Sequence, residues 1–174
     1  MKPDFSDISS LSEKLTKEAA LIAKRLGKNN IQLARRLVIM QVFVLMEALA
    51  HLMKQRIQEA YVRNDWQGHV TFEEWIASLG EDHTIQENGD LKFQVKRYRT
   101  LPHILFCLRL AAKSNQKKFD HSKINHWQSV KGANEVRNRI THPKSATQLE
   151  IKPEEYRLAV QTLRWFNESI RQIV

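Results

Sequence analysis

An arginine and a histidine near the end of the chain carry the clearest chemical signal in the sequence. Arg137 and His142 lie five positions apart in the segment Arg137-Asn138-Arg139-Ile140-Thr141-His142, which directly precedes Pro143. An arginine binds phosphate oxygens through two parallel hydrogen bonds and keeps its charge, whereas a histidine gives or takes a proton near neutral pH. This pair of residue types can support cleavage of RNA without a metal ion.

The position of this segment matters more than its spacing, because an arginine and a histidine at this interval arise by chance in roughly every second chain of such composition. The preceding residues predict an amphipathic helix that Ser122 caps and that ends at His142, since Pro143 disfavours helical geometry at the residue before it. On an ideal helix Asn138 shares a face with His142, whereas Arg137 lies about 140° away from it. The apolar positions of this helix recur every three or four residues, at Ile124, Trp127, Val130, Ala133, Val136 and Ile140.

A carboxylate inside an apolar helix is the second feature that bears on this site. The segment from Ile31 to Tyr61 predicts a long central helix, and its stretch from Leu37 to Ala50 is apolar nearly all round except for Gln41 and Glu47. An ionised carboxylate in such surroundings is costly unless a cation or several hydrogen bonds meet it, so we expect a basic partner for Glu47. Two interpretations remain open: Glu47 orients an active-site arginine, or it forms a structural pair at the edge of the buried face.

The remaining pattern predicts an all-α fold, a helical bundle of about five or six helices in one domain over residues 1–174. Five glycines and four prolines leave little punctuation for a many-stranded protein. The stretch around Asn88-Gly89 alternates as strands do, and it predicts a β-hairpin insertion over residues 81–99 with a type I′ turn. Further helices are expected from Ser10 to Leu26, from a capping box at Thr71 to just before Gly80, from His103 to Ala112, and from Pro153 onwards.

The charge and the single cysteine narrow the class of protein. The formal net charge of +9 favours an anionic partner such as nucleic acid or an acidic protein. Cys107 lies in an apolar run and should be a buried, inert thiol, and one cysteine allows no internal disulfide. The first residues hold no apolar signal segment, and the run from Leu37 to Ala50 is short for a membrane span. We therefore expect a soluble, cytoplasmic protein.

Four cations are candidates for contact with RNA phosphates. Arg97 and Arg99 flank Tyr98 at the end of the expected hairpin insertion, and interleaved cations and aromatic rings are typical of contacts with single-stranded nucleic acid. Arg139 and Lys144 lie within and just after the segment that ends at His142. A basic run of this kind also occurs at solvated strand ends, and that alternative stays open for Arg97 and Arg99.

The Arg137–His142 segment resembles the R-x4-6-H signature of the HEPN superfamily (higher eukaryotes and prokaryotes nucleotide-binding), in which a small polar residue such as Asn138 often follows the arginine. The long apolar helix with an embedded acid at Met46-Glu47-Ala48-Leu49, the insertion, the late motif helix and the closing helix are also similar to this family's bundle. The resemblance implies a metal-independent endoribonuclease that needs no cofactor. It assigns catalysis to Arg137, Asn138 and His142, with Glu47 in support.

The resemblance also implies a mechanism and partners. The RNA 2′-hydroxyl would attack the adjacent phosphate with His142 as general base or acid, Arg137 would stabilise the charge on the phosphorane oxygens, and Asn138 would position the phosphate or the imidazole. The products would be a 2′,3′-cyclic phosphate and a 5′-hydroxyl. Family members commonly dimerise around a shared cleft, which implies a homodimer with a composite site. A toxin or phage-defence effector with an antitoxin or another regulatory partner fits this picture, although Lys144 stands where one toxin subgroup has a modifiable tyrosine.

Two other classes of protein remain as alternatives. One is a catalytically inactive HEPN-like domain that binds nucleotide or RNA, or that serves as a protein-interaction scaffold. The other is a basic helical DNA-binding protein, for which the sequence offers no convincing recognition helix. The intact set of Arg137, Asn138 and His142 favours the ribonuclease, because a site that is no longer active would more readily lose one of the three residues.

Overall fold

The computed structural model describes residues 31–63, 70–95 and 98–173, together with scattered helical positions between Ser10 and Lys24. For residues 81–85, 91 and 93–95 it describes the backbone alone. The described chain is mostly helical, which confirms the predicted all-α class. The predicted first helix, from Ser10 to Leu26, lies partly outside the described residues.

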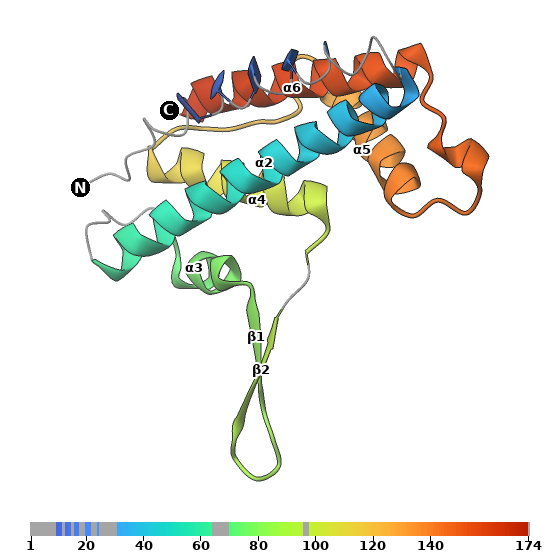
Figure 1. Cartoon of the computed structure of the whole chain (residues 1–174). Helices are drawn as coiled ribbons and strands as arrows, with labels where there is room; N and C mark the ends of the chain where they lie inside the picture. Colours follow the sequence, from blue (N-terminus) through green and yellow to red (C-terminus); the bar gives the residue numbers. More distant parts are fainter. Residues whose placement is uncertain are drawn as a thin grey trace.

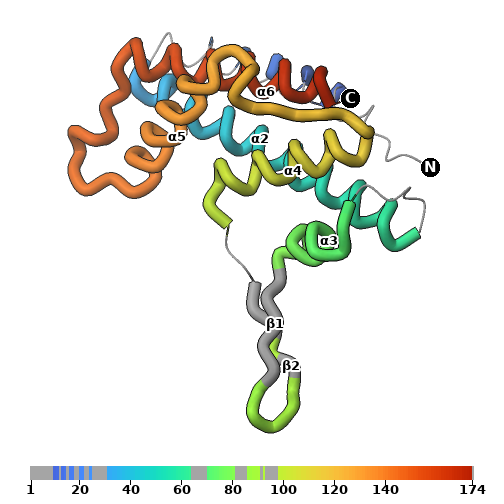
Figure 2. The backbone as a smooth tube through the Cα atoms, turned by 180° about the vertical axis from the view of Figure 1, so that it is seen from behind, coloured from blue at the N-terminus to red at the C-terminus, as the bar shows by residue number. Residues whose placement is uncertain are grey.

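Helix α2, Ile31–Val62, is the central element of the bundle (Figure 1). It contacts α4 (Thr100–Ser114), α5 (Trp127–Thr141) and α6 (Pro153–Ile173), and Figure 2, which views the molecule from behind, shows α4 crossing in front of α2. Burial against these helices explains its high apolar content, although by length and composition alone it would also pass as a membrane span. The largest fully buried side chains are Trp165, Phe43, Phe166, Ile39, Met46, Leu49, Met53, Ile57, Ile104, Leu108 and Ile151.

Helix α5 begins later than the sequence pattern predicts. Ser122 is not its cap, because both the backbone N–H (3.1 Å) and the hydroxyl (2.6 Å) of Ser122 donate to Asp120 Oδ1. His126 takes the N-cap position with a left-handed φ of +73°, and its side chain makes no capping hydrogen bond. The prediction was wrong because the Asp120 carboxylate offers the backbone a local turn that competes with the helix. The other end agrees with the prediction: α5 stops at Thr141, and a short 3₁₀ helix, η1 (Ala146–Leu149), follows.

A short helix, α3 (Phe72–Leu79), connects α2 to the two strands. It begins with the predicted capping box, in which Thr71 and Glu74 satisfy each other's backbone N–H groups. It ends at Gly80, whose φ of +72° is the left-handed conformation that glycine tolerates best. Glu74 also pairs with Lys113 at 2.7 Å, which ties α3 to the end of α4.

Strands β1 (Glu81–Ile85) and β2 (Leu91–Val95) pair antiparallel, with Ile85 opposite Leu91. Their turn is not the predicted type I′, because Gly89 has a positive φ (+85°) and Asn88 does not. The Asn88 side chain instead accepts a hydrogen bond from the N–H of Asp90 at 3.1 Å, which favours a longer connection. Helix α4 then begins at Thr100 rather than at the predicted His103, with Pro102 inside its first turn, where a missing N–H costs nothing.

Candidate active site at the end of helix α5

The buried face of α5 decides where its polar residues point. Val130, Val136 and Ile140 belong to the buried core. The helix packs closely on α6, and Gly132 permits this approach, since a Cβ at that position would lie 3.0 Å from Leu158 Cδ1. Arg137 is consequently half-buried and Asn138 is exposed to solvent.

The Arg137 guanidinium is held between two side chains. Its Nη2 lies 3.4 Å from Glu47 Oε1 on α2, and its Nη1 donates to Asn138 Oδ1 at 3.2 Å. The side chain of Arg137 is 22% exposed and that of Glu47 is 39% exposed. The basic partner expected for Glu47 is therefore the motif arginine itself, although the two residues lie 90 positions apart in the sequence.

These contacts orient the guanidinium without saturating it. Charge-assisted N–H···O bonds in proteins are usually about 2.7–2.9 Å long, so the contact between Arg137 and Glu47 is a weak one. Arg137 Nε is buried and has no hydrogen-bond partner among the described residues. A guanidinium with long contacts and partial exposure retains hydrogen-bonding capacity for an oxyanion such as phosphate.

His142 closes α5 with its backbone and leaves its imidazole exposed. Its φ of −129° and ψ of 57° lie outside the helical region, as expected before Pro143, and its N–H donates to Asn138 O at 3.2 Å. The Thr141 hydroxyl donates to the carbonyl oxygens of Arg137 (2.7 Å) and Asn138 (3.1 Å). These groups satisfy the carbonyl of Asn138, one of the last four carbonyls of the helix. Within the described part of the chain the imidazole has no hydrogen-bond partner.

The four cations expected to contact RNA differ in their surroundings. Arg139 Nη2 lies 2.8 Å from Glu155 Oε1, and this partly buried pair ties α5 to the first turn of α6. Lys144 is exposed just beyond the motif, and Arg99 is exposed at the N-cap of α4. Arg97 lies outside the described residues. Lys144 and Arg99 therefore present their charge to solvent, whereas Arg139 already has an ionic partner.

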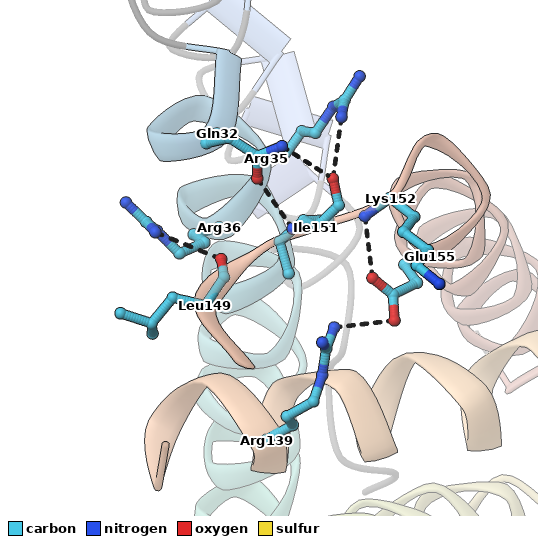
Figure 3. Close-up of polar contacts among 8 residues, drawn as sticks. All are labelled: Gln32, Arg35, Arg36, Arg139, Leu149, Ile151, Lys152 and Glu155. Carbon is cyan, nitrogen blue, oxygen red and sulfur yellow. Dashed lines mark hydrogen bonds and ion pairs between the residues drawn. The ribbon is translucent and has the colours of Figure 1, made fainter. Parts of the chain in front are cut away.

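The chain that follows His142 is held by the first turn of α2, a contact that the sequence analysis missed (Figure 3). Gln32 Oε1 accepts from the N–H of Ile151 at 2.8 Å and Gln32 Nε2 donates to Ile151 O at 3.3 Å, as a neighbouring strand would. Arg35 Nη1 also donates to Ile151 O at 2.9 Å, and Arg36 Nη1 donates to Leu149 O at 3.3 Å. Extended backbone needs such partners. No local pattern, however, indicates that they come from the far end of the chain.

His103 on α4 also acts on this part of the molecule, although it lies outside the Arg137–His142 segment. Burial lowers its pKa, Lys54 and His51 lower that pKa further, and Glu47 acts in the opposite direction. These electrostatic interactions place His103 close to the acid that contacts Arg137. No spacing in the sequence could have linked the two, because α4 and α5 reach this region only by packing against α2.

Cys107 takes no part in the site. Burial raises the pKa of its thiol to about 12, so the thiol stays protonated. This agrees with the buried, inert thiol that the sequence predicts. Among the described residues, no three His, Cys, Asp or Glu side chains gather as a metal site would require.

Comparison with protein-family models, with curated proteins and with solved structures finds no match to this chain. The likeness to the HEPN superfamily consequently rests on the residues themselves. The geometry adds that Glu47, Arg137 and Asn138 are in contact.

Proposed function

We propose that this protein is a metal-independent endoribonuclease of the HEPN type. The observation that carries the proposal is the chain of contacts from Glu47 through Arg137 to Asn138, which joins the embedded acid of α2 to the motif of α5. The exposed imidazole of His142 follows one helical turn after Asn138. A cation for phosphate oxygens and a group for proton transfer thus share one helix end.

In the proposed reaction the RNA 2′-oxygen forms a bond to the adjacent phosphorus, and the bond from that phosphorus to the 5′-oxygen breaks. His142 takes the proton of the 2′-hydroxyl or gives a proton to the leaving 5′-oxygen. Arg137 stabilises the negative charge that develops on the non-bridging oxygens, and Asn138 positions the phosphate or the imidazole. The products are a 2′,3′-cyclic phosphate and a 5′-hydroxyl.

A homodimer supplies the second proton-transfer group, because one His142 serves either as the base or as the acid. On the face that carries Glu47, helix α2 presents exposed apolar side chains, namely Leu33 (38% exposed), Leu37 (40%) and Val44 (51%). Their spacing of four and seven places them on one face of the helix, where a second copy can bury them. Sedimentation measures the oligomeric state of the wild type and of Val44→Lys. We expect the wild type to be a dimer and the variant, which places a charge on this face, to be a monomer.

Further parts of the proposal are the substrate, the location and the regulation of the enzyme. RNA is the substrate, and Arg97, Arg99, Arg139 and Lys144 are its possible phosphate contacts. The protein acts in the cytoplasm as a toxin or phage-defence effector, under an antitoxin or another regulator. Regulation by modification of a tyrosine after the motif does not fit this chain, because Lys144 occupies that position. We also propose that the two strands between α3 and α4 form a β-hairpin inserted into the helical domain.

The deciding experiment incubates purified protein with single-stranded and structured RNA in the presence of a chelator. We expect the wild type to cut and to leave 5′-hydroxyl ends, which polynucleotide kinase labels directly. His142→Ala and Arg137→Ala should lose this cutting. The matched controls are His126→Asn, at the opposite end of α5, and Arg164→Ala, at an exposed position of α6, and both should cut as the wild type does.

Intact RNA after incubation with the wild type would overturn the assignment, as would equal cutting by the motif variants and the controls. Binding of RNA by the wild type without any cutting would favour the inactive HEPN-like binding or scaffold domain.

A further inference from the structure

A half-open cavity of about 170 Å³ lies between α3 and α4 and is lined by Ala77, Tyr98, Pro102, His103 and Phe106. Its walls are almost wholly apolar. The rings of Tyr98 and His103 stack with their centroids 5.5 Å apart and their planes 11° from parallel. The Tyr98 hydroxyl donates to Ala77 O at 3.0 Å, which joins the two sides of the cavity. The cavity is therefore a preformed slot with aromatic walls.

The size and lining of this slot suit one flat ring. A protein cavity of about 150 Å³ holds a benzene molecule, so a cavity of 170 Å³ accommodates a single six-membered ring. The apolar walls offer no hydrogen bonds, and a ring with polar edges must keep those edges at the open side. A pyrimidine base fits both requirements, because it is one flat ring joined to a backbone that stays outside.

The charges around the slot favour a nucleobase over the apolar side chain of a protein partner. Arg99 is exposed directly after Tyr98, and Lys54 acts on His103 from α2. Neither cation has a carboxylate partner among the described residues. Glu47, the acid that contacts Arg137, also acts on His103. The slot is therefore accompanied by cations that a nucleic-acid backbone would neutralise, and one of its lining residues interacts electrostatically with Glu47.

We propose that this slot is a base-binding subsite for single-stranded RNA that takes a pyrimidine. The proposal rests on the nucleic-acid-binding part of the proposed function and adds a determinant of specificity to it. Stacking against the rings of Tyr98 and His103 tolerates different base edges, whereas the volume of the slot selects one ring over two. Arg99 and Lys54 are the cations that bind the backbone phosphates next to the bound base.

A DNA oligonucleotide that carries one 5-bromodeoxyuridine tests the subsite, because it lacks the 2′-hydroxyl and binds without being cut. After long-wave ultraviolet irradiation with the wild type, mass spectrometry should find the crosslink on Tyr98, His103 or Phe106. Tyr98→Ala should weaken the binding of oligothymidine by about fivefold or more, the loss expected for one base–aromatic stack. It should leave the affinity for an abasic oligomer of the same length unchanged.

Ala77→Leu places a larger side chain in the slot and should abolish the crosslink. Because leucine is a good helix former, circular dichroism should still show an intact helical fold. Phe72→Ala removes an aromatic ring that is 59% exposed and lies outside the slot, and it should change neither crosslink nor affinity. Crosslinks at other residues, or wild-type binding by Ala77→Leu, would overturn the proposal. It is equally overturned if indole shifts the His103 resonances while no oligonucleotide crosslinks, since the slot would then suit an apolar side chain of a protein.

The cleavage assay separates this proposal from the ribonuclease proposal. If RNA is cut while the bromodeoxyuridine crosslinks elsewhere, the subsite alone fails. If the crosslink forms in the slot while the wild type cuts no RNA, the nuclease assignment fails and the subsite belongs to an RNA-binding domain.

Discussion

Replacement of Glu47 by glutamine tests whether its carboxylate orients Arg137 or only stabilises the fold. Glu47→Gln removes the charge and nearly keeps the size of the side chain, so the packing of α2 should persist. The two side chains are 22% and 39% exposed and their contact is 3.4 Å long, so solvent screens the pair. Its contribution to stability should not exceed about 1 kcal/mol, which corresponds to a fall in Tm of about 2–4 °C for a chain of this size.

The effect of this substitution on cleavage should exceed its effect on stability. Without the carboxylate, the guanidinium keeps only its side-chain contact with Asn138 at 3.2 Å and samples other rotamers. We expect Glu47→Gln to lower kcat by about tenfold, because the cation is no longer held in one place. Arg137→Ala should lower it by about a hundredfold or more, as does the loss of a donor that stabilises transition-state charge.

The assay is single-turnover cleavage of one labelled RNA, with thermal unfolding of the same samples. Glu74→Gln is the matched control, because Glu74 pairs with Lys113 at 2.7 Å with comparable exposure (33% and 41%), and glutamine preserves the capping box with Thr71. The control should lose similar stability and cut at the wild-type rate. The reasoning is refuted if Glu47→Gln also cuts at the wild-type rate, or if its Tm falls far below that of Glu74→Gln while the rate per folded molecule is unchanged.

Three further predictions concern stability and reactivity. Gln32→Ala removes both hydrogen bonds to Ile151 and should lower the free energy of unfolding in urea by about 1–2 kcal/mol; an unchanged midpoint would contradict the contact. Cys107, whose thiol pKa is raised by burial to about 12, should react with a disulfide reagent near neutral pH only after unfolding, and rapid labelling of the native protein would disprove its burial. Burial and Lys54 lower the pKa of His103 below its ordinary value of 6.5, and burial and Arg109 do the same for His121. The unfolded state therefore binds more protons than the native state below that value, so stability should fall as the pH decreases from about 7.5 to 5.5. In thermal unfolding over this range His103→Gln should show a smaller fall than the wild type; an equal fall would refute the cause given.

The long helices were the most predictable part of the fold. The pattern from Ile31 to Tyr61 predicts a helix that the structure extends by one residue, to Val62, and α6 begins at the predicted Pro153. Apolar residues that recur over many turns define a face, and any bundle that buries this face preserves the helix. Pro153 at the first helical position adds a local start signal.

The errors of prediction occur where short polar side chains have a choice of backbone partners. Ser122 was a plausible helix cap, but its hydroxyl and N–H bond to Asp120 instead. Asn88 was expected to adopt a positive φ beside Gly89, but its side chain accepts from the N–H of Asp90. Each alternative differs by only one or two hydrogen bonds, and a pattern of residue types does not rank such alternatives.

The sequence by itself determined which candidate groups share one helix end. Arg137, Asn138 and His142 stay together because capping and the proline that follows act over a few residues. Only the tertiary structure decided that Glu47 faces Arg137, that Gln32 pairs with Ile151, and that Tyr98, His103 and Ala77 enclose a slot. These contacts join segments far apart in the chain, and they depend on how the helices are rotated and shifted against one another. That arrangement is set by the shapes of all the buried side chains together, so no short stretch of sequence contains it.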